Sequence, residues 1–187
     1  MEALKFETSA DLDEALAYDE RLELINGVII KRPLPRSRHG KAQGEVFGEL
    51  RPYNRKKSSD NDEGWFFFTE IDVQYNEFQR PTHDVAGWKK SRLPILPDKT
   101  IMTPPDWVCE IVSKGHEDKD TVDNFITLQK YQVPFYWVIW PEKQVLIAYE
   151  LIKNKYSAIE TIQGGGKYKI RPFDEIEFDL DYVFGNK

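Results

Sequence analysis

The chain has 187 residues, of which 40% are hydrophobic and 31% charged, a composition ordinary for one globular domain spanning residues 1–187. Its formal net charge of −6 argues against a protein that binds nucleic acid over its whole surface, and the single cysteine, Cys109, excludes an internal disulfide. No stretch is long and apolar enough to span a membrane, and the N-terminal segment lacks the apolar core of a signal peptide. We therefore expect a cytoplasmic protein without membrane contacts.

The charged residues are distributed unevenly along the chain. Residues 1–30 hold 2 basic and 8 acidic side chains, whereas residues 31–92 hold 13 basic and 9 acidic ones, and the remainder is acidic again. A basic segment of this kind attracts a phosphate backbone, so nucleic acid is one candidate partner. A solvated helix face with its loop would have the same composition, and the sequence leaves both interpretations open.

In the N-terminal third, the pattern predicts a short acidic helix over residues 8–19, with leucines facing inward. Residues 22–30 are two alternating apolar runs around an Asn-Gly pair, which is the strongest short signal for a β-hairpin. A loop then leads to an amphipathic helix over residues 39–54, and residues 56–63 are predicted to form a polar loop.

The centre of the chain, residues 105–140, predicts a strand, a turn, a helix and a second strand. Residues 107–112 are an apolar run rich in β-forming side chains, as expected of a buried central strand. The helix carries Val122, Phe125 and Leu128 on its inner face and ends before a proline. Short links between the three elements imply a parallel pair of strands with a right-handed crossover.

Strands are also predicted on both sides of this unit. Residues 65–75 open as an apolar run and then alternate, and residues 84–88 form a short strand. Residues 145–150 and 156–161 are predicted to form a C-terminal hairpin. The expected fold is therefore mixed α/β: a central mixed sheet flanked by helices, with N-terminal and C-terminal hairpins.

Three acids stand in or at the head of predicted strands: Glu23, Asp84 and Glu110. We expect neighbouring strands to bring Asp84 and Glu110 together, and two carboxylates in a partly dry site repel unless a cation lies between them. Oxygen ligands select a hard ion such as Mg²⁺, which polarises a phosphoryl oxygen and helps to generate a hydroxide nucleophile. Structural ion pairs with Arg or Lys explain such acids equally well.

The histidines, His39, His83 and His116, do not have the spacing of a zinc site, and a single cysteine does not suit a structural zinc site. His39 opens a helix beside two arginines, where it could contact a phosphate or simply cap the helix. His83 adjoins Asp84 and could support it. Cys109 faces the opposite side of its strand from the neighbouring acid, as a buried structural thiol does.

Five blocks of the sequence form a recognisable series: LELINGVI, PRSRH before a helix, HDVAGWKKSRLP, PDWVCEIVS and VPFYWVIWPE. They cover roughly residues 18–150 and, as a series, resemble the Uma family of restriction-endonuclease-like proteins, within the PD-(D/E)xK nuclease superfamily. The resemblance implies a restriction-endonuclease-like core and Mg²⁺-dependent hydrolysis of DNA phosphodiester bonds, with Mn²⁺ as an alternative ion.

The resemblance also implies roles for individual residues. The family's strand aspartate matches Asp84, which here follows His83 instead of the usual proline, and its strand glutamate matches Glu110. These two are the expected metal ligands. The glutamate of the opening hairpin matches Glu23, and the histidine before the first helix matches His39. Both are expected to line the same cleft and to complete the catalytic set.

One position departs from the family pattern. The family carries a catalytic lysine on the helix after the second strand, and the matching residue here is Asn124, which cannot carry a positive charge. Lys114 or Lys119, in the preceding turn, could reach the site in its place. Without a replacement, the chain would be a catalytically degenerate module that binds nucleic acid or a protein partner. Nucleases that cut both strands commonly pair, so a homodimer is a further expectation.

Overall fold

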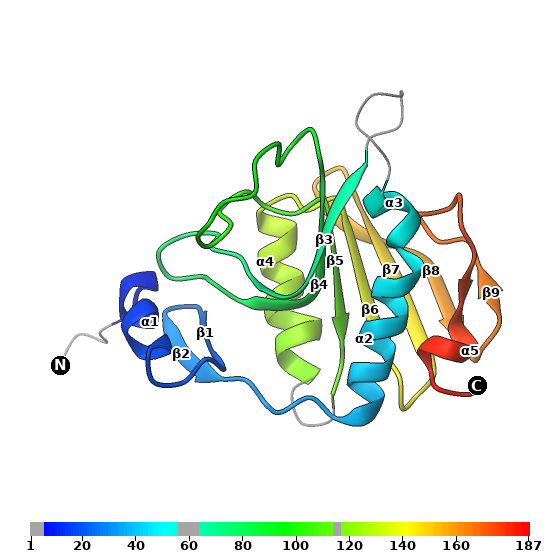
Figure 1. Cartoon of the computed structure of the whole chain (residues 1–187), viewed down its shortest axis with the longest axis horizontal. Coiled ribbons are helices and arrows are strands. Elements are labelled where there is room, and N and C mark those ends of the chain that lie inside the picture. The colour runs from blue at the N-terminus through cyan, green and yellow to red at the C-terminus, as the bar shows by residue number, and fades with distance from the viewer. Residues whose placement is uncertain (1–5, 56–63, 114–116) are drawn as a thin grey trace.

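The computed structural model describes residues 6–55, 64–113 and 117–187 (Figure 1). An N-terminal unit of one helix and one hairpin lies at one end, a sheet with helices on both faces forms the middle, and a C-terminal segment lies at the other end. The predicted polar loop at 56–63 and Lys114 lie outside the described residues. Within the described ranges, no helix combines the length and the apolar character that crossing a bilayer requires.

The N-terminal unit contains α1 (Ser9–Leu16), β1 (Leu22–Ile25) and β2 (Val28–Lys31). α1 begins with a capping box, in which the side chains of Thr8 and Asp11 accept each other's backbone N–H groups. The hairpin turns at Asn26 and Gly27, which both have positive φ, as a two-residue type I′ turn requires. The predicted helix and hairpin are therefore confirmed.

Arg80 attaches this unit to the rest of the molecule. Leu24 of β1 and Arg80 exchange two backbone hydrogen bonds, of 3.1 and 2.8 Å. The Arg80 guanidinium is buried between Asp72 and Asp13 of α1, with N–O distances of 2.5 and 2.6 Å. Because a buried charge is costly without partners, these two ion pairs fix the hairpin against the segment that contains Arg80.

The central sheet has six strands in the order β3-β4-β5-β6-β7-β8. They are β3 (Trp65–Asp72), β4 (Thr82–Lys89), β5 (Trp107–Ile111), β6 (Phe135–Trp140), β7 (Val145–Ile152) and β8 (Lys155–Gln163). β5 and β6 are parallel, and all other neighbours are antiparallel. The structure confirms the predicted mixed sheet, its parallel strand–helix–strand unit and its C-terminal hairpin of β7 and β8.

Helices cover both faces of the sheet (Figure 1). One face packs against α2 (Ser37–Glu49), α3 (Arg51–Arg55), β9 (Lys167–Tyr168), β10 (Phe178–Asp179) and α5 (Leu180–Val183). The other face packs against α4 (Asn124–Lys130), which follows a helical turn, η1 (Lys119–Asp123). Cys109 belongs to the first core and Val108 to the second, because side chains alternate along β5. Glu110 therefore shares the face of α4, and Cys109 points away from it as a buried thiol, as predicted.

The helix after β5 differs from the prediction in its first half. Residues 119–123 form a π-helical turn, and Val122 is 48% exposed instead of facing the core. A π-turn has more residues per turn than an α-helix, so the 3.6-residue spacing that puts Val122 on the same face as Phe125 and Leu128 does not apply there. Leu128, further along α4, is fully buried as expected.

Candidate active site

Asp84 and Glu110 lie on neighbouring antiparallel strands. The register pairs Val85 of β4 with Cys109 of β5, so Asp84 and Glu110 stand opposite each other one position further along the two strands. The backbone N–H of Asp84 donates to the Glu110 carboxylate at 3.2 Å, and the N–H of Ile111 donates to the Asp84 carboxylate at 2.7 Å. The two acids are close together, and each carboxylate is bound to the backbone of the other strand.

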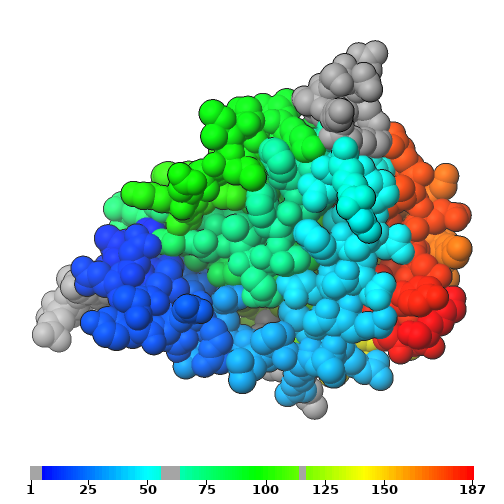
Figure 2. Space-filling model, viewed as in Figure 1, coloured from blue at the N-terminus to red at the C-terminus, as the bar shows by residue number. Residues whose placement is uncertain are grey.

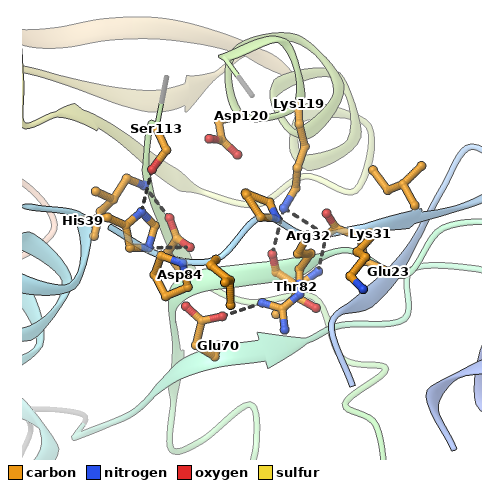
Figure 3. A pocket seen from close by; sticks show the side chains of 15 residues that line it. Glu23, Lys31, Arg32, His39, Glu70, Thr82, Asp84, Ser113, Lys119 and Asp120 are labelled. Carbon is orange, nitrogen blue, oxygen red and sulfur yellow. Dashed lines mark hydrogen bonds and ion pairs between the residues drawn. The ribbon is translucent and has the colours of Figure 1, made fainter. Parts of the chain in front are cut away.

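Asp84 lines a cavity of about 80 Å³ whose walls come from β1, the end of β2, α2, β3, β4 and η1 (Figure 3). Its acidic lining residues are Glu23, Glu70, Asp84 and Asp120. Its other charged or titratable lining residues are Lys31, Arg32, His39 and Lys119. Three of the four predicted site residues, Glu23, His39 and Asp84, therefore line one cavity.

Glu110, the fourth predicted residue, is 1% exposed and does not line this cavity. Its Oε1 accepts hydrogen bonds from His83 Nδ1 at 2.5 Å and from Asn124 Nδ2 at 2.9 Å, while its Oε2 accepts from Asp84. Burial, followed by the charge of Asp84, raises the pKa of Glu110 well above its usual range. Glu110 is therefore a buried acid that three hydrogen-bond donors hold behind the cavity.

His83 is neutral, because burial, followed by repulsion from Lys119, lowers its pKa to about 3. Burial also raises the pKa of Tyr75 well above its usual value, so its hydroxyl, 3.0 Å from Nε2 of His83, keeps a proton that it can donate to that nitrogen. Nδ1 then carries the ring proton and donates to Glu110. His83 thus supports the acid next to Asp84 on the neighbouring strand.

Lys119 places an ammonium group in the cavity. Its Nζ lies 2.9 Å from the Glu23 carboxylate and 3.2 Å from the backbone oxygen of Thr82. Burial disfavours the charged amine, but the combined attraction of Glu23, Glu110 and Asp120 outweighs burial and raises the pKa of Lys119 above its usual value. Glu23 is itself buried and also accepts from the N–H of Thr82. Of the two lysines that the sequence suggested, Lys119 therefore reaches the cavity, charged.

Asn124, at the position of the family's helix lysine, contacts Glu110. It is fully buried, and its Oδ1 has no hydrogen-bond partner in the part of the chain that the structure describes. Its backbone N–H donates to the carbonyl of Lys119, one π-turn earlier. Lys119 and Asn124 thus lie one above the other on adjacent turns of the helix, and of the two only Lys119 carries a charge.

His39, in the first turn of α2, faces Asp84. Its Nε2 lies 3.4 Å from the Asp84 carboxylate, and its Nδ1 lies 3.2 Å from the hydroxyl of Ser113, just after β5. Burial opposes the charged imidazolium, but the hydrogen bond and charge of Asp84 outweigh burial and raise the pKa of His39 above 6.5. The N-cap of α2 is Arg36, so His39 does not serve as the helix cap.

Sequence analysis does not single out Glu70, and it includes Arg32 only as part of a basic segment. Glu70 has a φ of 49° inside β3, which is uncommon for a residue with a side chain. Its carboxylate accepts from Arg32 at 2.5 Å and from Gln43 at 2.8 Å. Gln43 also donates to the backbone oxygen of Asp84. Glu70 and Arg32 belong to no sequence motif. The one signal that could have marked Glu70 is its place as an acid in the alternating part of a predicted strand.

The mixed sheet with helices on both faces and two acids on neighbouring strands is consistent with the expected nuclease-like fold, and a solved structure has the same fold. The chain is similar to "a putative nuclease belonging to DUF820 from Anabaena variabilis", with a TM-score of 0.71 and 21% sequence identity. The match covers 93% of this chain and 97% of that one. At this identity the likeness shows the fold alone. Comparison with curated proteins found no match.

The family follows from the sequence match. The model of the Uma2 family, described as "Putative restriction endonuclease", matches residues 7–181. The chain therefore belongs to the Uma2 family. This confirms both the resemblance found in the sequence and the restriction-endonuclease-like fold expected from it.

Proposed function

We propose that this protein is a metal-dependent endonuclease that hydrolyses the phosphodiester bonds of DNA. The observation that carries the proposal is the meeting of Asp84, Glu110 and Lys119: two carboxylates on neighbouring strands, with a charged amine at the cavity that Asp84 lines. Carboxylates hold hard divalent cations, and a fixed positive charge stabilises the charge that develops on a phosphoryl group. Membership of the Uma2 family supports the same class of reaction.

In this proposal, Asp84 and Glu110 are the two essential carboxylates beside a metal ion, Mg²⁺ or Mn²⁺, and Asp84 is the one that faces the cavity. The donor set fits such an ion, because Asp84 accepts a backbone hydrogen bond at only one of its two carboxylate oxygens. A bound ion of this kind polarises a phosphoryl oxygen and lowers the pKa of water. Glu110 offers an ion less than Asp84 does, since its Oε1 already accepts two hydrogen bonds, its Oε2 accepts one, and the residue is 1% exposed.

Two basic residues are proposed to act on the phosphate. Lys119, held by Glu23, replaces the family's helix lysine and stabilises negative charge in the transition state. Arg32 also lines the cavity, where Glu70 holds its guanidinium, and would place a second positive charge near a phosphate. Glu23 and His39 complete the set: Glu23 orients Lys119, and His39 faces Asp84 at the same cavity.

The proposed path of the DNA follows α2 and α3, beginning at the cavity. The exposed basic residues along it are Arg36, Arg38, Lys41, Arg51 and Arg55. Figure 2 shows the surface of these two helices running across the face of the molecule beside the N-terminal unit. A row of cations of this kind attracts a phosphate backbone. The same proposal includes a homodimer in which each subunit's cavity cuts one strand of the DNA. It also includes a cytoplasmic location.

The test is cleavage of plasmid and of single-stranded DNA, with Mg²⁺ and with Mn²⁺. We expect the parent to cleave, and Asp84→Asn, Glu110→Gln and Lys119→Met each to slow cleavage by about 100-fold or more. Glu160→Gln, which removes an exposed charge from β8 at the far edge of the sheet, should leave the rate unchanged. Circular dichroism checks that each variant is folded. An inactive parent, or an Asp84→Asn variant as fast as the parent, contradicts the proposal.

One observation favours a second candidate function, a nuclease-fold module that binds DNA without cleaving it. Asn124 touches Glu110 where the family has a lysine, and it supplies no charge. Asn124→Lys separates the two candidates. If the protein is a degenerate module, the parent is inactive and Asn124→Lys gives it cleavage activity. If Lys119 already acts as the catalytic lysine, the parent is active and Asn124→Lys changes the rate little. Because Asn124 is fully buried, the melting temperature of the variant is measured beside its activity.

A further inference from the structure

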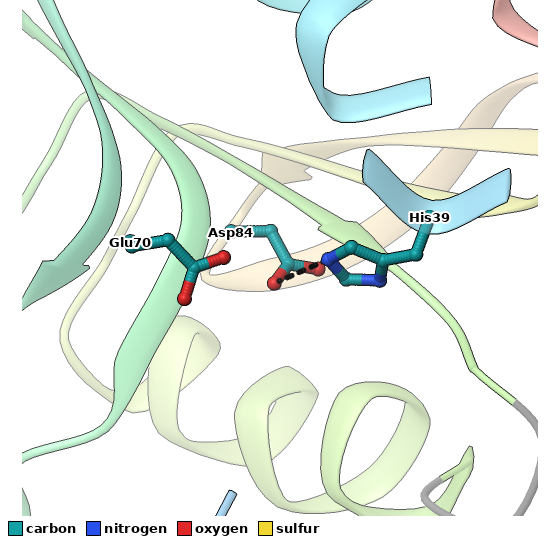
Figure 4. Close-up of side chains that lie close together, drawn as sticks. All are labelled: His39, Glu70 and Asp84. Atoms are coloured by element: carbon teal, nitrogen blue, oxygen red, sulfur yellow. Dashed lines mark ion pairs between the residues drawn. The ribbon is translucent and has the colours of Figure 1, made fainter. Parts of the chain in front are cut away.

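His39, Glu70 and Asp84 form a cluster of metal-ligand groups at the cavity (Figure 4). The three residues belong to different elements, α2, β3 and β4, and their side chains point toward one another. One nitrogen or oxygen atom from each lies within 4.8 Å of the other two. Glu70 has no part in the nuclease site inferred from the sequence, so this cluster is a different ligand set from the pair of Asp84 and Glu110.

The surrounding hydrogen bonds leave each member able to bind a cation. Nδ1 of His39 lies beside the Ser113 hydroxyl, and Nε2 faces the Asp84 carboxylate, so a cation bound there would take the place of the proton on Nε2 while Nδ1 keeps its hydrogen bond. The N–H of Ile111 occupies Oδ2 of Asp84 and leaves Oδ1, the oxygen that faces His39. Each oxygen of Glu70 accepts one hydrogen bond, and a carboxylate oxygen has two lone pairs.

Gln43 fixes the spacing of the two carboxylates. Its amide nitrogen donates to the Glu70 carboxylate and to the backbone oxygen of Asp84, both at 2.8 Å. The ligands are therefore arranged before any ion binds, which lowers the entropic cost of assembling them.

Glu110 is less available to an ion than Glu70. Its residue is 1% exposed, whereas the side chain of Glu70 is 41% exposed and lines the cavity. Oε1 of Glu110 accepts from both His83 and Asn124, so only Oε2, which accepts from the backbone of Asp84, has a lone pair left, and Glu110 does not line the cavity. Binding through Oε1 would leave one of these buried donors without an acceptor, which is unfavourable.

We infer that His39, Glu70 and Asp84 bind a divalent cation, and that Glu110 positions Asp84 and does not bind the ion. One nitrogen and two oxygen ligands suit Mn²⁺ and other first-row transition ions, whereas Mg²⁺ takes oxygen ligands in a strict octahedron. The catalytic use of this ion rests on the proposed function, but its binding does not.

The test is Mn²⁺ binding to the whole chain without DNA, measured by titration calorimetry and by the EPR signal of free Mn²⁺. His39→Ala and Glu70→Gln should each weaken Mn²⁺ binding by about 10-fold or more, and Glu110→Gln by less than about 3-fold. Mg²⁺ should bind the parent more weakly than Mn²⁺. Glu45→Gln is the matched control, because it removes a carboxylate of α2 that pairs with Lys41 outside the cavity.

Two results overturn this inference: a parent that does not bind Mn²⁺, or a Glu70→Gln variant that binds like the parent while Glu110→Gln loses the ion. The second result would return Glu110 to the ligand set. Failure of the proposed function looks different. A parent that binds Mn²⁺ through His39 and Glu70 but cuts no DNA keeps the inference and rejects the nuclease. Glu70 is a partly exposed side chain, so its glutamine variant is expected to fold, and circular dichroism checks this.

Discussion

Lys119 and Glu23 form a nearly buried ion pair, and such pairs respond asymmetrically to substitution. The side chain of Glu23 is 1% exposed and that of Lys119 18% exposed. Removing one partner leaves the other charge without a counter-ion, whereas removing both does not. We therefore expect Lys119→Met to lower the free energy of unfolding by about 3 kcal/mol. Adding Glu23→Gln should recover part of that loss, as measured by urea denaturation; a double variant less stable than Lys119→Met would contradict this account.

At the scale of single residues, the sequence predicts most of the acids and the histidine that come together at the site. It predicts their hydrogen-bond partners less well. Glu23, His39 and Asp84 meet at one cavity because the hydrophobic pattern positions the hairpin, helix and strand that carry them. One partner of Glu110, Asn124, directly follows a π-turn that helical periodicity does not anticipate. Glu70 reaches the cavity through a positive φ inside a strand, which no residue preference signals for glutamate.

At the scale of elements, α2 carries three exposed glycines, Gly40, Gly44 and Gly48, and a Cβ at any of them would meet no atom within 4 Å. Glycine inside a helix is less favourable than alanine because it loses more backbone entropy on folding. We expect Gly44→Ala to raise the free energy of unfolding by about 0.5–1 kcal/mol, measured by thermal and urea denaturation.

Gly87 of β4 provides the opposite case. A Cβ there would lie 2.7 Å from the ring of Phe67, which stacks with Trp65 over the glycine. Gly87→Ala should therefore lower the free energy of unfolding by about 1–3 kcal/mol through overpacking. A stabilised Gly87→Ala protein, or a destabilised Gly44→Ala protein, would contradict the packing described for these elements.

Most elements follow from local pattern alone. Both hairpins have alternating strands around turn residues, and the β5–β6 unit has a short strand, helix and strand that fit only a crossover. The π-turn of η1 is the exception, because the apolar spacing of residues 119–128 predicts an ordinary α-helix there. The placement of the hairpin beside β3 and β4 also depends on long-range ion pairs of Arg80, which the sequence does not reveal.

At the scale of the whole molecule, an acidic protein is proposed to bind DNA through one basic surface. Arg36 and Arg38 are exposed where α2 begins at the cavity. Changing both to glutamine should reduce the slope of log affinity against log salt by about 0.9 for each phosphate that the variant no longer neutralises, between about 50 and about 200 mM salt. Fluorescence anisotropy measures this. Lys153→Gln with Lys155→Gln, on the exposed β7–β8 hairpin, is the matched control, and equal slopes for parent and arginine variant would place the DNA elsewhere.

The N-terminal hairpin contributes Glu23 to the cavity and leads directly into Arg32, yet its buried residues Leu24 and Ile25 belong to neither core of the sheet. Local unfolding of this unit need not disturb β5, whose residues are all buried. Amide hydrogens of residues 22–31 should therefore exchange with solvent faster than those of 107–111, as mass spectrometry can measure. The cavity then lies between a unit that opens locally and a sheet that stays folded, which would let a long polymer enter it from the side without threading an end.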